Sequence, residues 1–140
     1  MENTDIHPSS FNLLKYKIVR SDFKINDNYT QSAPFDAKFD PSGVFNTKEC
    51  QFELTLRVII TDSKENFYVD VTAKATFGIN KKESKESLDK FFYINAPSII
   101  FPYVRAYISA LMTLSENPFI IPTFNLVALG QHLKDNTKEI

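Results

Sequence analysis

The sequence of 140 residues has one cysteine, three glycines, two histidines and no tryptophan. The lone Cys50 excludes a disulfide within the chain and a cysteine-based metal cluster. Three glycines are too few to build a glycine-rich loop that holds phosphate groups. His7 and His132 have no cysteine or acidic residue near them at metal-ligand spacing. We therefore expect no bound metal and no cofactor.

Motifs of enzyme active sites are also missing. No serine, cysteine or lysine stands in a recognisable nucleophile motif. The apolar alternation that begins at Cys50 places its thiol on the inner face of a strand, where it is buried and inert. We therefore expect no catalytic residue and no enzyme activity. An enzyme or carrier that holds a small molecule in an apolar groove remains an alternative.

The formal net charge of −1 gives no indication of nucleic-acid binding. The first residues lack the basic start and apolar core of a signal peptide, and no apolar run reaches the length of a membrane span. We therefore predict a cytoplasmic protein without membrane insertion. Its length predicts a single domain over residues 1–140, with a flexible lead-in at 1–10 and a flexible tail at 135–140.

Two segments alternate between apolar and polar residues, which predicts two half-buried strands, Cys50–Ile60 and Phe67–Ile79. A turn through Asp62–Glu65 would place Arg57 opposite Asp70, so the predicted hairpin carries an ion pair on its outer face. The inner face needs a cover, and the helix that follows can supply it.

Two earlier segments are less regular. Phe11–Ile25 predicts a long strand with Leu14 on its apolar face, and the change of apolar phase further along indicates a bulge near Val19–Asp22. Phe35–Phe45 predicts a short strand that lies at an edge or is interrupted, because it contains Pro41 and Gly43.

The most informative segment is a helix over about Ile100–Leu114 that has almost no polar face. Ala96-Pro97 is predicted to break the preceding helix, Ser98 to cap this one, and Asn117-Pro118 to end it. A surface helix needs an apolar stripe of only about 100°. The remaining apolar surface therefore indicates contact with another subunit or an apolar ligand. Asn125 is predicted to cap a last short helix.

Three motifs in the second half of the chain carry a family resemblance. F-P-Y-V-R-A-Y-I-S-A-L at Phe101–Leu111 resembles the F-P-Y-A-R helix of SecB, the bacterial protein-export chaperone. N-L-V-A-L at Asn125–Leu129 resembles the N-F-D-A-L helix start of SecB, and Phe67–Ile79 is similar to its last strand. The chain is identified as a divergent member of the SecB-like superfamily, with a good match over Phe67–Leu129 and a weak one before Cys50.

This resemblance implies an α+β fold, in which a four-stranded antiparallel sheet is followed by helices packed on one face. It also implies a homotetramer, a dimer of dimers, that holds unfolded or export-bound polypeptides in apolar grooves without ATP. The oligomer interface implied is Tyr103, Tyr107, Leu111 and Leu114. The client-binding groove implied is Phe23, Phe35, Phe39, Phe45, Leu126 and Leu129.

The chain departs from SecB where that protein contacts the export motor SecA through acidic residues. The matching positions are Arg20, Lys24 and Asp70, and only one of these is acidic. We therefore expect SecA binding to be weak, and we expect Asp70 to pair with Arg57. An alternative function is that of a dedicated chaperone for one client, such as the antitoxin of a toxin–antitoxin system.

Overall fold

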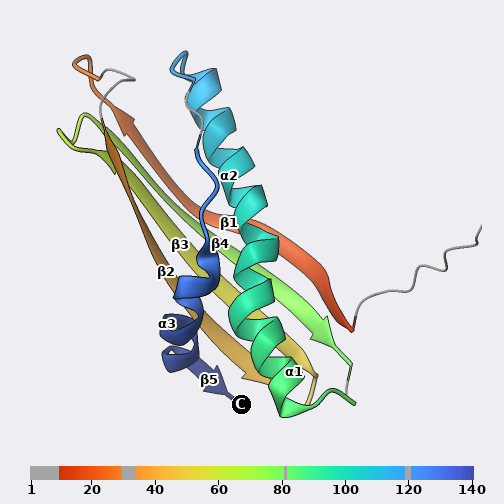
Figure 1. Cartoon of the computed structure of the whole chain (residues 1–140). Coiled ribbons are helices and arrows are strands. Elements are labelled where there is room, and N and C mark those ends of the chain that lie inside the picture. Colours follow the sequence, from red (N-terminus) through yellow and green to blue (C-terminus); the bar gives the residue numbers. More distant parts are fainter. Residues whose placement is uncertain (1–9, 30–33, 81, 119–120) are drawn as a thin grey trace, which may run out of the picture.

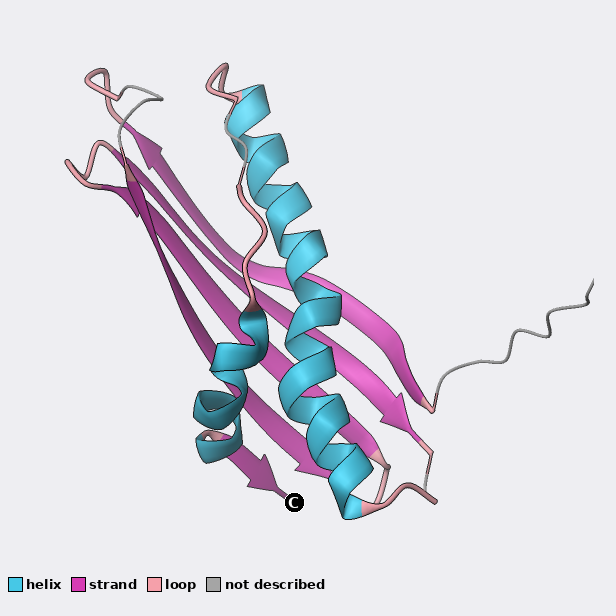
Figure 2. Cartoon of the chain, viewed as in Figure 1, coloured by secondary structure: helices cyan, strands magenta, loops and turns pink. Residues whose placement is uncertain are grey.

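The computed structural model describes residues 10–29, 34–80, 82–118 and 121–140. A five-stranded sheet in the order β1-β4-β3-β2-β5 is covered on one face by helices (Figures 1 and 2). The α+β fold with helices on one face is confirmed. Most of the predicted lead-in, residues 1–9, lies outside the described residues.

The strands are β1 (Phe11–Ile25), β2 (Phe35–Asn46), β3 (Gln51–Asp62), β4 (Phe67–Ile79) and β5 (Thr137–Glu139). The helices are α1 (Lys85–Lys90), the π-helical turn η1 (Phe91–Asn95), α2 (Ala96–Leu114), the 3-10 turn η2 (Leu126–Leu129) and α3 (Gly130–Asp135).

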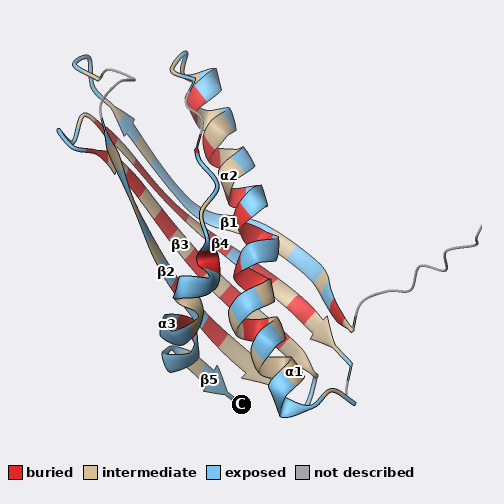
Figure 3. Cartoon of the chain, viewed as in Figure 1, coloured by how far each residue is buried: buried red, intermediate tan, exposed pale blue. Residues whose placement is uncertain are grey.

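The core lies between α2 and the inner face of β3 and β4 (Figure 3). Alternate residues of both strands are buried, as the period-two pattern predicts. One stripe of α2 supplies the other half of the core, with side chains one helical turn apart. Burying each such side chain stabilises the fold by about 1.5–3 kcal/mol. The stripe consists of Ile100, Val104, Ile108 and Met112, all fully buried.

Two bulges interrupt β1. The register against β4 shifts between Ile18 and Arg20, which confirms the bulge predicted near Val19–Asp22 and places it at Val19. It also shifts between Leu13 and Lys15. The second bulge was not predicted. It turns Leu14 away from the core, so that this side chain is 56% exposed, and the predicted place of Leu14 on the apolar face is wrong. A β-bulge adds one residue to one strand, so the alternation between inner and outer face shifts by one residue at the bulge.

The β3–β4 register differs by two residues from the prediction. Asp70 lies opposite Ile59, and Arg57 lies opposite Thr72. The carboxylate of Asp62 accepts a hydrogen bond from the backbone N–H of Phe67 at 3.1 Å, which closes the hairpin around residues 63–66 instead of 62–65. Arg57 still reaches Asp70, because diagonal neighbours on one sheet face lie within reach of long side chains.

Cys50 is not on the inner face of a strand. It lies in the turn between β2 and β3 with a φ of 50°, and its side chain is half-buried. The alternation therefore begins one residue later, at Gln51, because Cys50 takes the left-handed conformation that reverses the chain.

The predicted helix break at Ala96-Pro97 is wrong, because helical residues continue from Lys85 to Leu114. The wider π turn η1 ends directly before α2, and Pro97 takes a place in the first turn of α2, where a missing amide is tolerated. Ser98 is not a cap, since its hydroxyl donates to the carbonyl of Ile94 at 3.0 Å. The N-cap is Ser84, whose side chain accepts from the N–H of Ser87.

The C-terminal segment is ordered, so the predicted flexible tail at 135–140 is wrong. Thr137–Glu139 form β5, which pairs with Gly43–Phe45 of β2 in parallel and makes the fifth strand. Gly43 makes this approach possible, since a Cβ there would lie 2.7 Å from the ring of Phe52 and 2.9 Å from Oγ1 of Thr137.

Pro41 does not interrupt β2, because the register continues through its pairing with Leu56. The edge position that was predicted as the alternative is confirmed, since β5 pairs only with residues beyond Pro41. At an edge, the missing N–H of proline costs no ladder hydrogen bond.

The packing of α2 gives a first test of the fold. Ile108→Ala should lower the free energy of unfolding by about 2–5 kcal/mol, because it leaves a cavity in a fully buried site. Thr113→Ala, on an exposed turn of the same helix, should change it by less than about 0.5 kcal/mol. Urea titration followed by circular dichroism measures both. Equal losses in the two variants would contradict the packing described.

Candidate functional site

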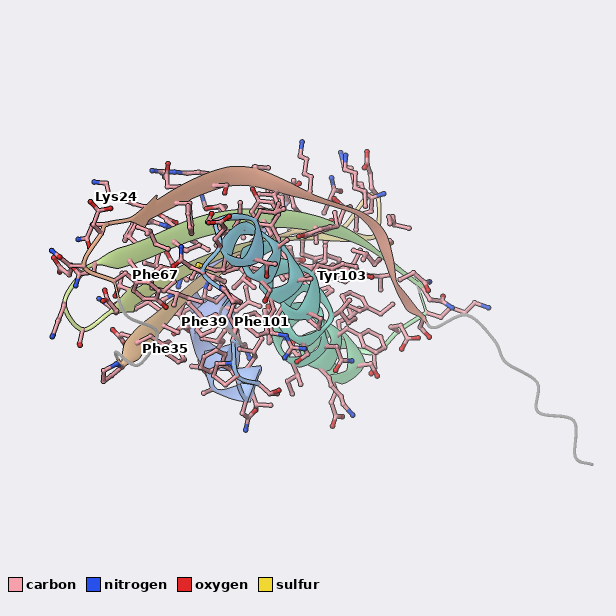
Figure 4. The ribbon with its side chains drawn as sticks, turned by 90° about the horizontal axis from the view of Figure 1, so that it is seen from above. Lys24, Phe35, Phe39, Phe67, Phe101 and Tyr103 are labelled. Carbon is pink, nitrogen blue, oxygen red and sulfur yellow. The ribbon has the colours of Figure 1, made fainter. Side chains whose placement is uncertain are left out.

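Three aromatic rings meet between β2 and α2. The ring of Phe39, on β2, lies 5.4 Å from that of Phe101 on α2 and 5.3 Å from that of Phe124, both edge-to-face. Phe101 and Phe124 are 5.9 Å apart, and Phe124 belongs to the segment that joins α2 to η2. Phe39 and Phe124 are only half-buried, so the cluster presents apolar surface to the outside. Figure 4 shows Phe39 beside Phe101.

The outer edge of β2 runs past this cluster. Within the described residues, no strand pairs with that edge before Gly43. The N–H of Gly43 and the carbonyl of Phe45 bond outward to the C-terminal segment. Since backbone groups alternate in direction along a strand, those of Ala37 and Phe39 also point outward. An aromatic cluster thus lies beside a row of backbone donors and acceptors.

The predicted groove residues do not all lie together. Phe39 belongs to the cluster, and Phe35 begins the same strand, half-buried and opposite Asp62. Phe45, near the other end of β2, packs on Phe92 with ring centroids 4.8 Å apart. Phe23 is on β1, on the far side of β3 and β4, where it lines a separate hollow of about 600 Å³.

The last two predicted groove residues lie on η2. Leu126 is buried in the core, and Leu129 is half-buried against it. Neither Phe101 nor Phe124 was predicted, although Phe101 begins the F-P-Y-V-R motif. Sequence patterns give no signal for Phe124, because its contact with Phe39 depends on how the chain returns across the sheet.

The narrow polar stripe of α2 faces this returning segment. A hollow of about 510 Å³ lies between them, and the guanidinium of Arg105 approaches the hydroxyl of Thr123 at 3.4 Å. The polar stripe therefore has a partner within the chain. The hollow is lined by Arg105, Ser109, Thr113, Pro118, Ile121, Pro122 and Thr123.

The opposite side of α2 carries the predicted oligomer residues. Tyr103 is 49% exposed, and its ring lies 5.1 Å from that of Tyr16 on β1. Leu114 is 83% exposed, whereas Tyr107 and Leu111 are half-buried. Burial raises the pKa of Tyr16, with a smaller effect from the neighbouring tyrosines. Among the described residues, β1 covers this side of α2 only in part, so Tyr103 and Leu114 leave an apolar stripe exposed.

The three positions that match the SecA contact differ in their surroundings. Arg20 is exposed and pairs with Asp22 at 2.8 Å, and Lys24 is exposed. Asp70 is fully buried and accepts bonds from Nε and Nη2 of Arg57 at 3.0 and 2.7 Å. The predicted Arg57–Asp70 ion pair is thus confirmed. The hydroxyl of Tyr68 donates to the same carboxylate at 3.0 Å.

These contacts keep Asp70 ionised. The hydrogen bonds from Arg57 are the largest cause of a lowered pKa of the Asp70 carboxyl. The hydrogen bond to Asp70 raises the pKa of the Tyr68 hydroxyl. Since Asp70 is occupied within the chain, the exposed charges at these three positions are the two cations.

In the described part of the chain, no cluster of three or more histidine, cysteine or acidic residues is placed to hold a metal ion. The described helices also include none with the length and hydropathy needed to cross a membrane.

The family model of SecB, the preprotein translocase subunit, matches residues 41–135. The chain belongs to the SecB family. The match runs from within β2 to the end of α3, so it includes Phe101 and Phe124 of the aromatic cluster but not Phe39. It confirms the resemblance carried by the motifs in Phe67–Leu129. It also includes the F-P-Y-V-R segment of α2.

Two individual comparisons agree with this. The protein-export protein SecB of Buchnera aphidicola subsp. Schizaphis graminum is 31% identical over an alignment of 124 positions, covering 73% of this chain and 78% of that protein. The solved structure of the Mycobacterium tuberculosis SecB-like chaperone Rv1957, in complex with a ChAD peptide from the Rv1956 HigA1 antitoxin, superimposes with a TM-score of 0.69. That match has 14% identity and covers 82% of this chain and 90% of the other, so it shows a shared fold.

The buried ion pair predicts how the stability of this SecB-family chain depends on pH. Asp70 has a lowered pKa in the folded state, so it stabilises the fold above about pH 4 and loses this effect as the pH falls through its folded pKa. Asp70→Asn should therefore lower the urea midpoint at pH 7, and the difference from wild type should shrink at pH 3.

Asp22→Asn is the matched control, because its ion pair with Arg20 is exposed and contributes little. Its urea midpoint should stay close to wild type at both pH values. A difference for Asp70→Asn that stays constant or grows on acidification would contradict the role given to the ion pair.

Proposed function

We propose that this SecB-family chain is an ATP-independent chaperone that holds unfolded or export-bound polypeptides in the cytoplasm. The observation that carries the proposal is the β2 edge around Ala37 and Phe39, which pairs with no strand among the described residues and lies beside the Phe39–Phe101–Phe124 cluster. An extended polypeptide can add to an exposed strand through its backbone and place alternate side chains against apolar surface. Both features select for chains that are not folded, because folded proteins bury these groups.

Holding needs no chemical step. A protein that binds only the unfolded state of a client lowers the free concentration of that state by mass action. Ordering a disordered client is costly, so tight holding requires several client segments to be bound at once. A site with one open strand edge and one small aromatic cluster suits weak binding of each segment and little selectivity for sequence.

Copies of the chain would supply these multiple sites. We propose that the exposed stripe of α2 packs between copies to form a tetramer, a dimer of dimers. An uncovered apolar stripe of this kind is a common sign of a protein–protein contact. The stripe is the predicted interface, Tyr103, Tyr107, Leu111 and Leu114, together with the adjacent exposed Ile99.

We further propose that SecA binding is weak. Arg20 and Lys24 are exposed cations at two of the positions that match the acidic SecA contact of SecB, and Asp70 is buried under Arg57. Charges of the wrong sign at a contact repel the partner and slow association.

A second candidate is a chaperone dedicated to one partner. The mycobacterial SecB-like chaperone with this fold was solved with a peptide from an antitoxin. If the present chain serves one such client, a single protein should purify with it in fixed ratio, and general holding of unfolded test proteins should be poor.

The aromatic cluster gives a direct test of holding. Phe39→Ala should weaken binding of an unfolded test protein by about tenfold, because an aromatic contact of roughly 1.4 kcal/mol is lost. The measurement is the suppression of light scattering by the aggregating B chain of reduced insulin, without nucleotide.

Phe91→Ala is the control, since Phe91 is also half-buried but stacks on Phe11 at 5.2 Å, away from the cluster. It should preserve suppression at a similar loss of stability. The proposal fails if the wild-type chain does not suppress aggregation at several-fold excess, or if the two variants are equally impaired.

The oligomer interface has its own test. Tyr103→Asp combined with Leu114→Asp should convert the tetramer to smaller species, because two charges would be buried in an apolar contact. Light scattering coupled to size exclusion gives the mass. Val127→Asp is the control, since Val127 is 54% exposed on η2 and outside the stripe. A monomeric wild-type chain would overturn the interface.

A further inference from the structure

We infer that β5 is a resident occupant of a second strand-binding position on the β2 edge, and that a long bound polypeptide displaces it. This inference rests on the proposed function, since the displacing strand is the client. It concerns the part of β2 beyond Pro41, whereas the open part considered above lies before it.

The hydrogen bonds show that this part of the edge binds an extended strand. The N–H of Gly43 donates to the carbonyl of Asn136 at 3.1 Å, and the carbonyl of Phe45 accepts from the N–H of Ile140 at 2.8 Å. The N–H of Thr47 donates to the carbonyl of Ile140 at 3.0 Å. These bonds are made by backbone atoms, so another polypeptide can make them in the same way.

The position also offers apolar surface. Phe45 packs on Phe92, and Phe92 stacks on Phe52 with ring centroids 4.2 Å apart. Phe45 is half-buried, as Phe39 is in the open part of the edge. The two parts thus repeat one arrangement, in which a half-buried phenylalanine of β2 lies beside a strand edge.

Few side-chain contacts hold β5 in place. Lys138, Glu139 and Ile140 are exposed, and Thr137 is only half-buried. The hydroxyl of Thr137 donates to the carbonyl of Leu133 at 2.6 Å, and the exposed hydroxyl of Thr47 donates to the carbonyl of Ile140 at 2.9 Å. Segments with few buried contacts open with small free energies.

The helix before β5 is anchored independently of the strand. Leu133 of α3 is fully buried, and His132 of α3 lies 3.0 Å from Asp40 of β2. Residues 136–140 can therefore leave the edge while α3 stays in place.

This arrangement separates the position beside Phe39 from the position beside Phe45. The second position is available only after β5 is released. Pro41 has no N–H to offer, and α3 contacts β2 at Asp40, between the open and the occupied parts. A short client segment binds beside Phe39 without disturbing β5. A client with a further extended segment gains the Phe45 position only when β5 leaves, and its affinity is reduced by the fraction of molecules that are closed.

The experiment locks β5 reversibly. Val44 and Lys138 are register partners, so V44C and K138C, with C50S to remove the native thiol, place two thiols side by side on adjacent strands. The probe is reduced, carboxymethylated α-lactalbumin, a permanently unfolded chain, and its affinity is measured by fluorescence anisotropy. If β5 is docked in about nine of ten molecules of the reduced full chain, removal of β5 should tighten probe binding at the Phe45 position about tenfold relative to that chain.

The expected result is weaker probe binding by the oxidised protein, restored by reduction, and tighter binding by a chain truncated after Asp135. The amides of Gly43 and Thr47 should exchange with solvent faster than those in the centre of β3, since local release exposes them. The double variant K138C/C50S, treated with the same oxidant, is the control for effects of the reagent.

The outcomes separate the two proposals. Equal probe binding by the oxidised, reduced and truncated proteins would overturn the displacement of β5 and leave the holding function intact. Binding by none of them, nor by wild type, would overturn the holding function and this inference with it. If the truncated chain does not fold, the comparison between the oxidised and reduced forms of the V44C/K138C/C50S protein still tests the displacement of β5.

Discussion

The packing of α2 against β3 and β4 is the contact on which the other features depend. Its buried stripe, including Ile100 and Ile108, fills the inner face of the two central strands. One helix cannot cover five strands, because neighbouring strands lie about 4.8 Å apart and a helix is about 10 Å wide. The β2 side of the sheet is therefore covered by the segment that returns after α2. The candidate site lies where this segment leaves Phe39 and Phe124 only half-buried.

The returning segment has two roles that oppose each other. It contributes Phe124 to the aromatic cluster, and it ends in β5, which occupies part of the β2 edge. Gly43 is essential to the second role, since a side chain there would meet Phe52 and Thr137. The same backbone that offers binding positions to another polypeptide therefore also binds the chain itself, and Pro41 divides the two parts.

Much of the fold could be predicted from local pattern. Period-two alternation located β3 and β4, the change of phase located the bulge at Val19, and Asn125 does accept from the N–H of Val127 at 3.1 Å. Family membership followed from Phe101–Leu111. The wrong predictions arose where two local interactions favour different structures. Charge pairing favoured one hairpin register, but the Asp62 carboxylate closes the turn one residue later, which shifts the pairing of β3 with β4 by two residues. Ala96-Pro97 reads as a break, yet a π turn accommodates it.

The sequence by itself determined that the four long strands form, which faces of β3 and β4 are apolar, and that α2 has more apolar surface than one sheet can cover. Those properties depend on the periodicity of apolar residues along the chain, which is visible in the sequence without knowledge of the fold. Only the tertiary structure decided that Phe39, Phe101 and Phe124 meet, that Phe23 lies apart from them, and that residues 137–139 pair with β2. Such contacts join residues far apart in sequence, and they depend on where the chain crosses the sheet, which no local pattern contains.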